Sequence, residues 1–251
     1  MTLANFLATG MYKVLIIINA NQVSNQGTVV AGSPATQRMT ATLKEAIAFP
    51  SKEDTTVTVV AAHQLLNANN PYDPNDPNWI CCPLTIELPP QFEFPAAKLF
   101  RTCRDIKGTR QWVEDNLHLR TGNNIKQVWH GNYWLPIVLT AKSPMYGEVI
   151  GEGELPNSYQ QPVEFPDNKR QSLYGLGYQL LESLSAQPAV YLIQFGFQDD
   201  TLIFDRVWPF PAAPALASIG VQIPNLYACH WQCLSQQPIW DLLTSSAMQS
   251  R

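Results

Sequence analysis

The spacing of apolar residues in the first part of the chain predicts two strands and a helix. The segment YKVLIIINA (12–20) is rich in β-branched residues and predicts a buried strand. Met39, Leu43 and Ile47 recur at intervals of four, which places them on one face of a helix. In TTVTVVAA (55–62) threonine alternates with valine, which favours a second strand. The chain therefore opens as strand, helix, strand.

Prolines interrupt this pattern in the next part of the chain. Three prolines and several asparagines stand between Leu66 and Trp79, and we expect a long surface loop there, because few regular elements tolerate that composition. The following segment, ICCPLTIELPPQFEFP (80–95), is extended but rich in proline. Proline confines strands to the edges of sheets, so this segment is interpreted as an edge strand or an irregular arm.

A helix and a hairpin are the clearest predictions in the second part of the chain. Leucines spaced along DNKRQSLYGLGYQLLESL (167–184) predict an amphipathic helix, and Gly175 and Gly177 within it suggest the close approach of another backbone. AVYLIQFGF (189–197) and TLIFDRV (201–207) flank an Asp-Asp turn and predict a β-hairpin.

Two more helices are expected near the end of the chain. NLYACHWQCL (225–234) begins with Asn225 as a helix cap, and PIWDLL (238–243) begins with proline at the first helical position. The order helix, hairpin, crossover, helix is typical of an α+β fold. We therefore expect a mixed, largely antiparallel sheet with helices packed on one face. The chain divides at residue 124 into an N-terminal α/β region (1–124) and a C-terminal α+β region (125–251), or forms one continuous domain.

Composition limits the class of partner. Charged residues make up 14% of the chain and its net charge is −4, whereas a typical globular domain has about 25% charged residues. The densest basic stretch, Arg101–Arg110, also contains an aspartate, so a strong electrostatic grip on nucleic acid is disfavoured. No apolar run is long enough to span a membrane, and no signal peptide is evident. Five cysteines without an export signal favour reduced thiols and a cytoplasmic protein.

The segment FDRVWPFPAAPA (204–215) has the strongest candidate site. Asp205 and Arg206 stand where the predicted hairpin ends, and they could bind a cation and an anion respectively, or form a surface ion pair worth ~0–1 kcal/mol. The prolines exclude regular structure after them. Trp208 and Phe210 then pack onto the sheet or fill a partner's groove.

An aromatic cluster and a pair of cysteines are weaker candidates. Trp129, Tyr133 and Trp134 lie near His130 and could stack a base or a ring, or pack in the core.

The cysteines of CHWQC (229–233) share a helix face, which could contribute to a zinc site if His230 and the pair Cys81–Cys82 lay close by. Buried thiols without a ligand are commoner. We therefore expect no metal centre.

Residues 168–243 resemble the final section of ATP-grasp enzymes. The shared order is a hydrophobic strand, a turn, a second strand that ends in an acid, an exit that contains proline, and a helix. In those enzymes an acidic residue on each strand binds magnesium together with ATP. Asp205 matches the second of these positions, whereas Gln194 stands at the first. The resemblance implies a nucleotide-dependent enzyme, or a degenerate relative with a weakened metal site.

Three functions compete. The few charges, the long segments with proline and the absence of an assembled catalytic motif favour a non-catalytic binding protein, such as an adaptor, an assembly factor or a subunit of a larger complex. Its partner would be another protein, bound through Leu66–Trp79 and Asp205–Pro214. The first alternative is a nucleotide- and magnesium-dependent enzyme that uses Asp205 and Arg206, with Glu152 or Glu154 as a further acid. The second is a nucleic-acid-associated subunit that uses the basic stretch and the aromatic residues from Trp129 to Trp134. No catalytic residue and no cofactor follow from the sequence.

Overall fold

A small parallel sheet is built around the most apolar strand of the chain. The computed structural model describes residues 12–24, 26–49, 55–67, 72–73, 76–125 and 130–244. β1 (Lys13–Ile18) lies in the centre of this sheet, with β4 (Thr56–Ala61) on one side and β5 (Trp79–Pro83) on the other. Residues 14–18 are fully buried. A parallel strand that is covered on both faces is a nearly continuous run of apolar residues. The segment YKVLIIINA has this pattern, and the predicted buried strand is confirmed.

α1 (Pro34–Ala48) covers this sheet and confirms the predicted helix. The Ser33 side chain caps it by accepting a hydrogen bond from the backbone N–H of Thr36. Met39, Leu43 and Ile47 are all buried, so the spacing of four identified the inner face correctly.

The larger sheet has seven strands. Their order is β10–β9–β7–β11–β12–β6, with β8 paired to β7. β11 and β12 form the predicted hairpin, and only the β12–β6 pair is parallel. The strands are β6 (Arg120–Thr121), β7 (Tyr133–Leu139), β8 (Pro144–Tyr146), β9 (Ile150–Glu152), β10 (Tyr159–Gln160), β11 (Ala189–Gln198) and β12 (Thr201–Trp208).

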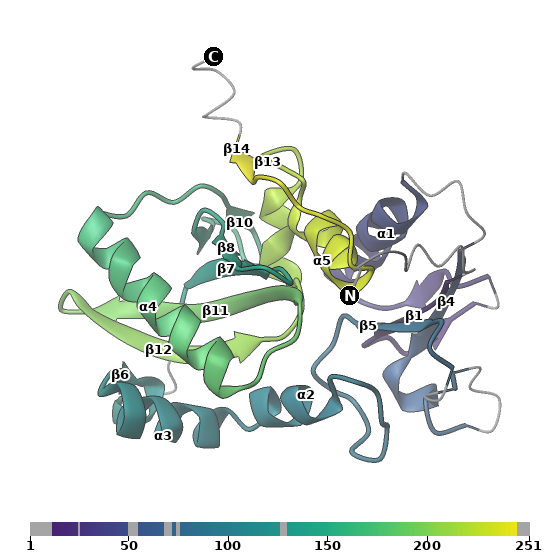
Figure 1. Ribbon diagram of the computed structural model, residues 1–251, viewed down its shortest axis with the longest axis horizontal. Coiled ribbons are helices and arrows are strands. Elements are labelled where there is room, and N and C mark those ends of the chain that lie inside the picture. Colours follow the sequence, from purple (N-terminus) through teal and green to yellow (C-terminus); the bar gives the residue numbers. More distant parts are fainter. Residues whose placement is uncertain are drawn as a thin grey trace, which may run out of the picture.

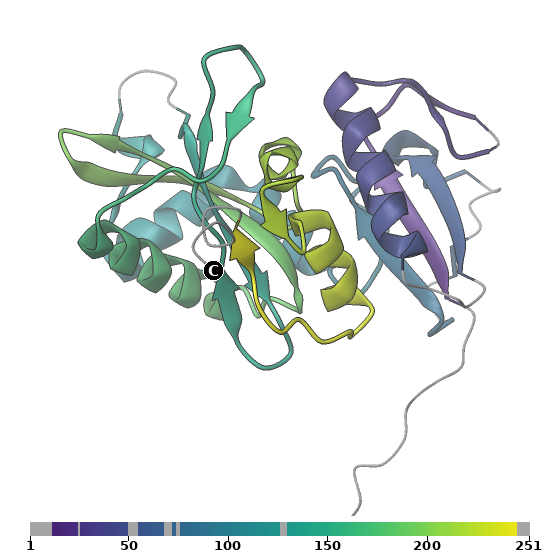
Figure 2. The same cartoon turned by 90° about the horizontal axis from the view of Figure 1, so that it is seen from above.

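Helices cover both faces of this sheet. α4 (Asp167–Ser183) and α3 (Ile106–Leu117) pack with Tyr191 and Ile193 on one face, whereas α5 (Leu226–Leu234) packs with Val190 and Leu192 on the other. Figures 1 and 2 show α4 over the β11–β12 hairpin and α5 between the two sheets, next to α1. The expectation of helices on one face was wrong, because β11 is apolar on both faces and therefore needs two covers.

The remaining elements are short. They are β2 (Gln22–Val23), β3 (Val29–Ala31), α2 (Ala97–Arg104), β13 (Gln222–Ile223), β14 (Leu243–Thr244), and three 3₁₀ helices, Ala62–Gln64, Gly122–Asn124 and Ala213–Ser218. Residues 238–243, where a helix was predicted, form none: the chain is irregular up to residue 242, and β14 then pairs with β13. Within the described ranges, none of the helices is long and apolar enough to cross a membrane.

The fold is a mixed α/β fold. The expected antiparallel character holds only in part, because the first sheet is parallel and the second is mixed. One hydrophobic core cluster includes Ile16 and Leu43 of the first part together with Trp134, Leu192 and Trp231 of the second. The division at residue 124 stays a prediction.

Candidate functional site

A β-bulge on β12 positions the residues that the sequence singled out. Gln194 pairs with Arg206 and Phe195 pairs with Phe204, so Asp205 is an extra residue with no partner on β11. A bulge of this kind redirects a side chain and is common near functional sites. Here it turns Asp205 toward α3 and leaves Arg206 beside Gln194 on the sheet.

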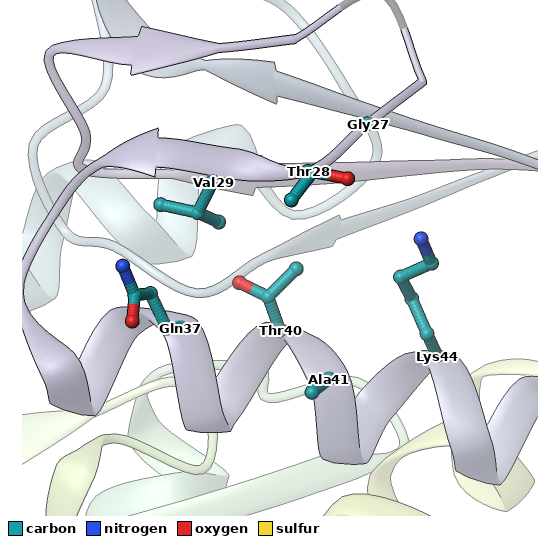
Figure 3. Close-up of a pocket in the computed structure, with 7 residues that line it drawn as sticks. All are labelled: Gly27, Thr28, Val29, Gln37, Thr40, Ala41 and Lys44. Atoms are coloured by element: carbon teal, nitrogen blue, oxygen red, sulfur yellow. The ribbon is translucent and has the colours of Figure 1, made fainter.

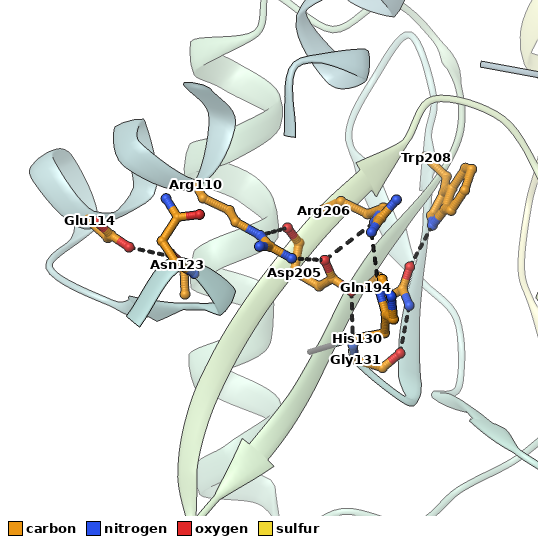
Figure 4. A network of polar contacts seen from close by, with 10 residues as sticks. Arg110, Glu114, Asn123, His130, Gly131, Gln194, Asp205, Arg206 and Trp208 are labelled. Carbon is orange, nitrogen blue, oxygen red and sulfur yellow. Dashed lines mark hydrogen bonds and ion pairs between the residues drawn. The ribbon is translucent and has the colours of Figure 1, made fainter. Parts of the chain in front are cut away.

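Asp205 is fully buried, and both oxygens of its carboxylate accept hydrogen bonds. Arg110 of α3 donates from Nε to the Asp205 backbone oxygen over 2.9 Å and from its NH2 group to Oδ1. Arg206 donates from Nε to Oδ1 over 3.3 Å. The backbone N–H of Gly131 donates to Oδ2 over 2.9 Å. Figure 4 shows these donors converging on one carboxylate from three separate parts of the chain.

Gly131 can approach this closely because it has no side chain. A Cβ at residue 131 would meet the backbone of Phe195 well inside van der Waals contact. The Gly131 carbonyl also accepts a hydrogen bond from Nε2 of Gln194 over 2.6 Å. The glycine therefore joins Asp205 to Gln194 through its own backbone.

A second layer of side chains lies beside the buried carboxylate. The Arg206 guanidinium lies 5.6 Å from the Trp208 ring centroid, and its NH2 group is 3.3 Å from Nδ1 of His130. Nε1 of Trp208 donates to Oε1 of Gln194 over 2.9 Å. We call Asp205, Arg206, Trp208, Gln194 and His130 the strand-end site.

Arg206 gives the strand-end site its exposed cationic group. Arg206 and Arg110 of α3 both contact the single buried carboxylate of Asp205. Arg206 keeps 19% of its side chain exposed, and His130 keeps 63%. Among the described residues, no second carboxylate pairs with Arg206. The site therefore favours an anion.

The residues present do not fit a protein-held magnesium ion. Magnesium needs free oxygen ligands in a near-octahedral arrangement, whereas both oxygens of Asp205 already accept hydrogen bonds and the side chain has no exposed surface. The Gln194 amide is equally committed, to Gly131 and Trp208. The cation-binding role considered for Asp205 was wrong, and so was the idea of a surface ion pair, because the carboxylate is buried.

The other predicted site residues do not join this network. Phe210 is buried and stacks on Phe100 with a centroid distance of 5.9 Å, so it is a core residue. Trp134 is buried against Tyr159. Glu152 is exposed on β9, and no hydrogen bond or ion pair between described residues links its side chain to the strand-end site.

The nucleic-acid interpretation loses its two supports. Arg101 and Arg104 form ion pairs with glutamates, and Arg110 lies under β12, so the basic stretch is not a free cationic surface. Tyr133 and Trp134 pack into cores on opposite faces of the sheet. Trp129, like part of the predicted loop from Leu66 to Trp79, lies outside the described residues.

The cysteines do not gather around a metal position. All five are free, and all but Cys81 are buried. Within the described part of the chain, no group of three or more His, Cys, Asp or Glu residues has metal-binding geometry. Burial raises the pKa of Cys103 and of Cys233 to about 12, which keeps both thiols protonated at neutral pH.

A cavity of about 460 Å³ lies between α1 and the β2–β3 hairpin (Figure 3). Lys44 is the one charged residue on its wall. The hydroxyl of Thr40, also on the wall, donates to the Thr36 carbonyl and is therefore already used. The cavity is open, and we assign no ligand to it.

Sequence reasoning missed the residues that complete the site. Arg110 was counted as part of a dilute basic stretch, although it contacts Asp205 across 95 positions of sequence. Gly131 was assigned no role in the site. The available signal was an acid next to an arginine at a predicted strand end. It could not reveal the partners that lie far away in the sequence.

Solved structures match this chain. No protein-family model matches it, and neither does any curated protein. Glycinamide-RNase-transformylase T from Mycobacterium tuberculosis superposes with a TM-score of 0.61 and 12% identity, over 90% of this chain and 82% of that chain. N5-carboxyaminoimidazole ribonucleotide synthetase from Thermotoga maritima gives a TM-score of 0.62 and 9% identity, over 92% and 77%. An ADP complex of the same synthetase gives 0.64 and 8%, over 93% and 79%.

These comparisons overturn the expected adaptor or complex subunit. The proteins that share the fold are ATP-grasp-type enzymes, and the resemblance first seen in residues 168–243 extends over nine-tenths of the chain or more. The chain therefore has a mixed α/β fold similar to the folds of these enzymes.

Proposed function

We propose that this protein is a nucleotide-dependent enzyme of the ligase type, which binds the phosphate groups of its nucleotide at the strand-end site through Arg206. The observation that carries the proposal is the partly exposed guanidinium of Arg206, held at the end of β12 by a buried carboxylate, within a fold similar to that of a synthetase whose structure holds ADP. A planar guanidinium with an exposed edge suits phosphate oxygens.

Phosphate recognition in this proposal does not depend on a carboxylate that holds magnesium. Asp205 serves as a buried counter-ion that orients Arg206 from behind, over 3.3 Å. Trp208 offers a ring beside the guanidinium, and its own N–H is fixed by Gln194. Packed residues already hold these side chains in place, so that binding a nucleotide costs less side-chain conformational entropy.

We propose that this enzyme is located in the reducing cytosol. The supporting observation is that all five cysteines are free.

Calorimetric titration with ADP tests the nucleotide site. Arg206→Gln should weaken ADP binding about tenfold, because a hydrogen bond to a charged group is worth about 1.5–3 kcal/mol. Arg101→Gln, which removes an exposed arginine paired with Glu93, should leave the affinity unchanged. Equal affinity in wild type and Arg206→Gln would place the nucleotide elsewhere.

Turnover tests the enzymatic half of the proposal. ADP formation from ATP is measured with pooled carboxylic acids and amines as co-substrates. We expect formation of ADP that depends on the pool and that falls in Arg206→Gln. ADP binding without any turnover across such pools argues for a binding role alone.

A further inference from the structure

The junction between β5 and α5 contains two adjacent cavities with shared wall residues, and the strand-end site uses neither of them. The outer cavity, of about 590 Å³, lies beside β5, whose other edge pairs with β1. The inner cavity, of about 30 Å³, shares with it a set of wall residues: Cys81, Phe94, Ala96, Gln187, Pro188 and Leu234. Sites for small molecules have volumes of about 300–1,000 Å³, so the outer cavity is large enough for one.

His230 lines the inner cavity with an unused hydrogen-bond donor. The side chain is buried on α5, and its Nδ1 accepts a hydrogen bond from the backbone N–H of Val190 over 3.2 Å. In a neutral imidazole the nitrogen that accepts carries no proton, so the proton is on Nε2. Among the described residues, Nε2 has no hydrogen-bond partner.

The ring stays neutral at physiological pH. Burial lowers the pKa of His230 to about 3, because the charged form would lose its hydration. Nε2 is therefore a permanent donor, and a buried donor without an acceptor is unfavourable. An acceptor atom brought within hydrogen-bond distance of Nε2 would satisfy it.

The walls of both cavities determine what kind of molecule could bring that acceptor. No Asp, Glu, Lys or Arg lines either cavity. Aromatic and aliphatic side chains dominate the walls, among them Trp79, Phe94, Phe100 and Leu234. A charged ligand would lose its hydration here without gaining an ionic partner, so the walls select against ions.

We propose that this junction is a second ligand site, which binds an uncharged aromatic molecule with a carbonyl or amide oxygen, and that this oxygen accepts a hydrogen bond from Nε2 of His230. The inner cavity has room for the oxygen and the outer cavity for the ring. None of the residues that line the two cavities belongs to the strand-end site, so this inference stands or falls independently of the nucleotide proposal.

The test titrates two probes with the same ring into the full chain labelled with ¹⁵N histidine. 4-Fluorobenzamide has an amide oxygen and fluorobenzene has no such acceptor. The amide should shift the His230 Nε2–H resonance and bind about tenfold more tightly than fluorobenzene, which corresponds to one net hydrogen bond. Equal affinity for the two probes overturns the proposal, and so does binding of neither.

Two variants locate the binding. His230→Asn keeps an acceptor near the position of Nδ1 and removes the Nε2 donor, so the affinity for the amide should fall about tenfold, to the level of fluorobenzene. Ala96→Phe fills the shared wall without touching the His230 hydrogen bond and should abolish binding of both probes. Ala141→Phe, in an exposed turn, should change neither affinity. An amide affinity that stays unchanged in His230→Asn, or amide binding that survives in Ala96→Phe, contradicts the proposal.

Discussion

At the scale of single residues, the contribution of Asp205 to stability depends on the groups that donate hydrogen bonds to it. Its carboxylate faces two arginines and one backbone N–H with no solvent contact. Asp205→Asn removes the negative charge and leaves Arg110 and Arg206 uncompensated, so we expect the free energy of unfolding to fall by about 3 kcal/mol. Asp199→Asn, in the exposed turn of the same hairpin, should change it by less than about 0.5 kcal/mol. Urea denaturation measures the free energy of unfolding of both variants. Similar losses in the two would show that the buried network contributes no more to stability than the exposed turn does.

His230 adds a pH dependence at the same scale. Its pKa falls from 6.5 to about 3 on folding, so below pH 6.5 the unfolded chain takes up a proton that the folded chain refuses. Stability is therefore fully present above pH 6.5 and is lost as pH falls, by up to about 1.4 kcal/mol per pH unit down to pH 3. His230→Asn should lose stability less steeply between pH 6 and pH 4. Parallel slopes for variant and wild type would mean that His230 is not buried as described.

At the scale of elements, α4 contains two glycines with opposite roles. A Cβ at Gly175 would have no atom within 4 Å, whereas one at Gly177 would press on Ile137 in the core. Gly175→Ala should therefore raise the free energy of unfolding by about 1 kcal/mol, and Gly177→Ala should lower it. The sequence predicted α1, α4, α5 and the hairpin because each has a local period. It could not predict that α5 covers the face opposite α4, since both faces of β11 are apolar, nor that Arg110 reaches Asp205, since no local pattern encodes a contact over that distance.

At the scale of the whole molecule, one core cluster runs through both sheets. It joins β1 and α1 to β11 through α5, so neither part buries its apolar surface alone. We expect tryptophan fluorescence and far-UV circular dichroism to report one coincident transition in urea. Leu43→Ala, in α1, should then lower the midpoint seen by both probes. Two separated transitions would instead support independent domains divided at residue 124.

In the function we propose, arginine, not a carboxylate with magnesium, receives the phosphate groups of a nucleotide at the end of β12. The most direct test is the affinity of the full chain for ADP, measured by calorimetry first with a chelator and then with excess magnesium chloride. We expect measurable binding without the metal ion and an affinity that magnesium changes by less than about threefold, against the tenfold that a difference of 1.4 kcal/mol would give. Binding that appears only when magnesium is added would contradict it.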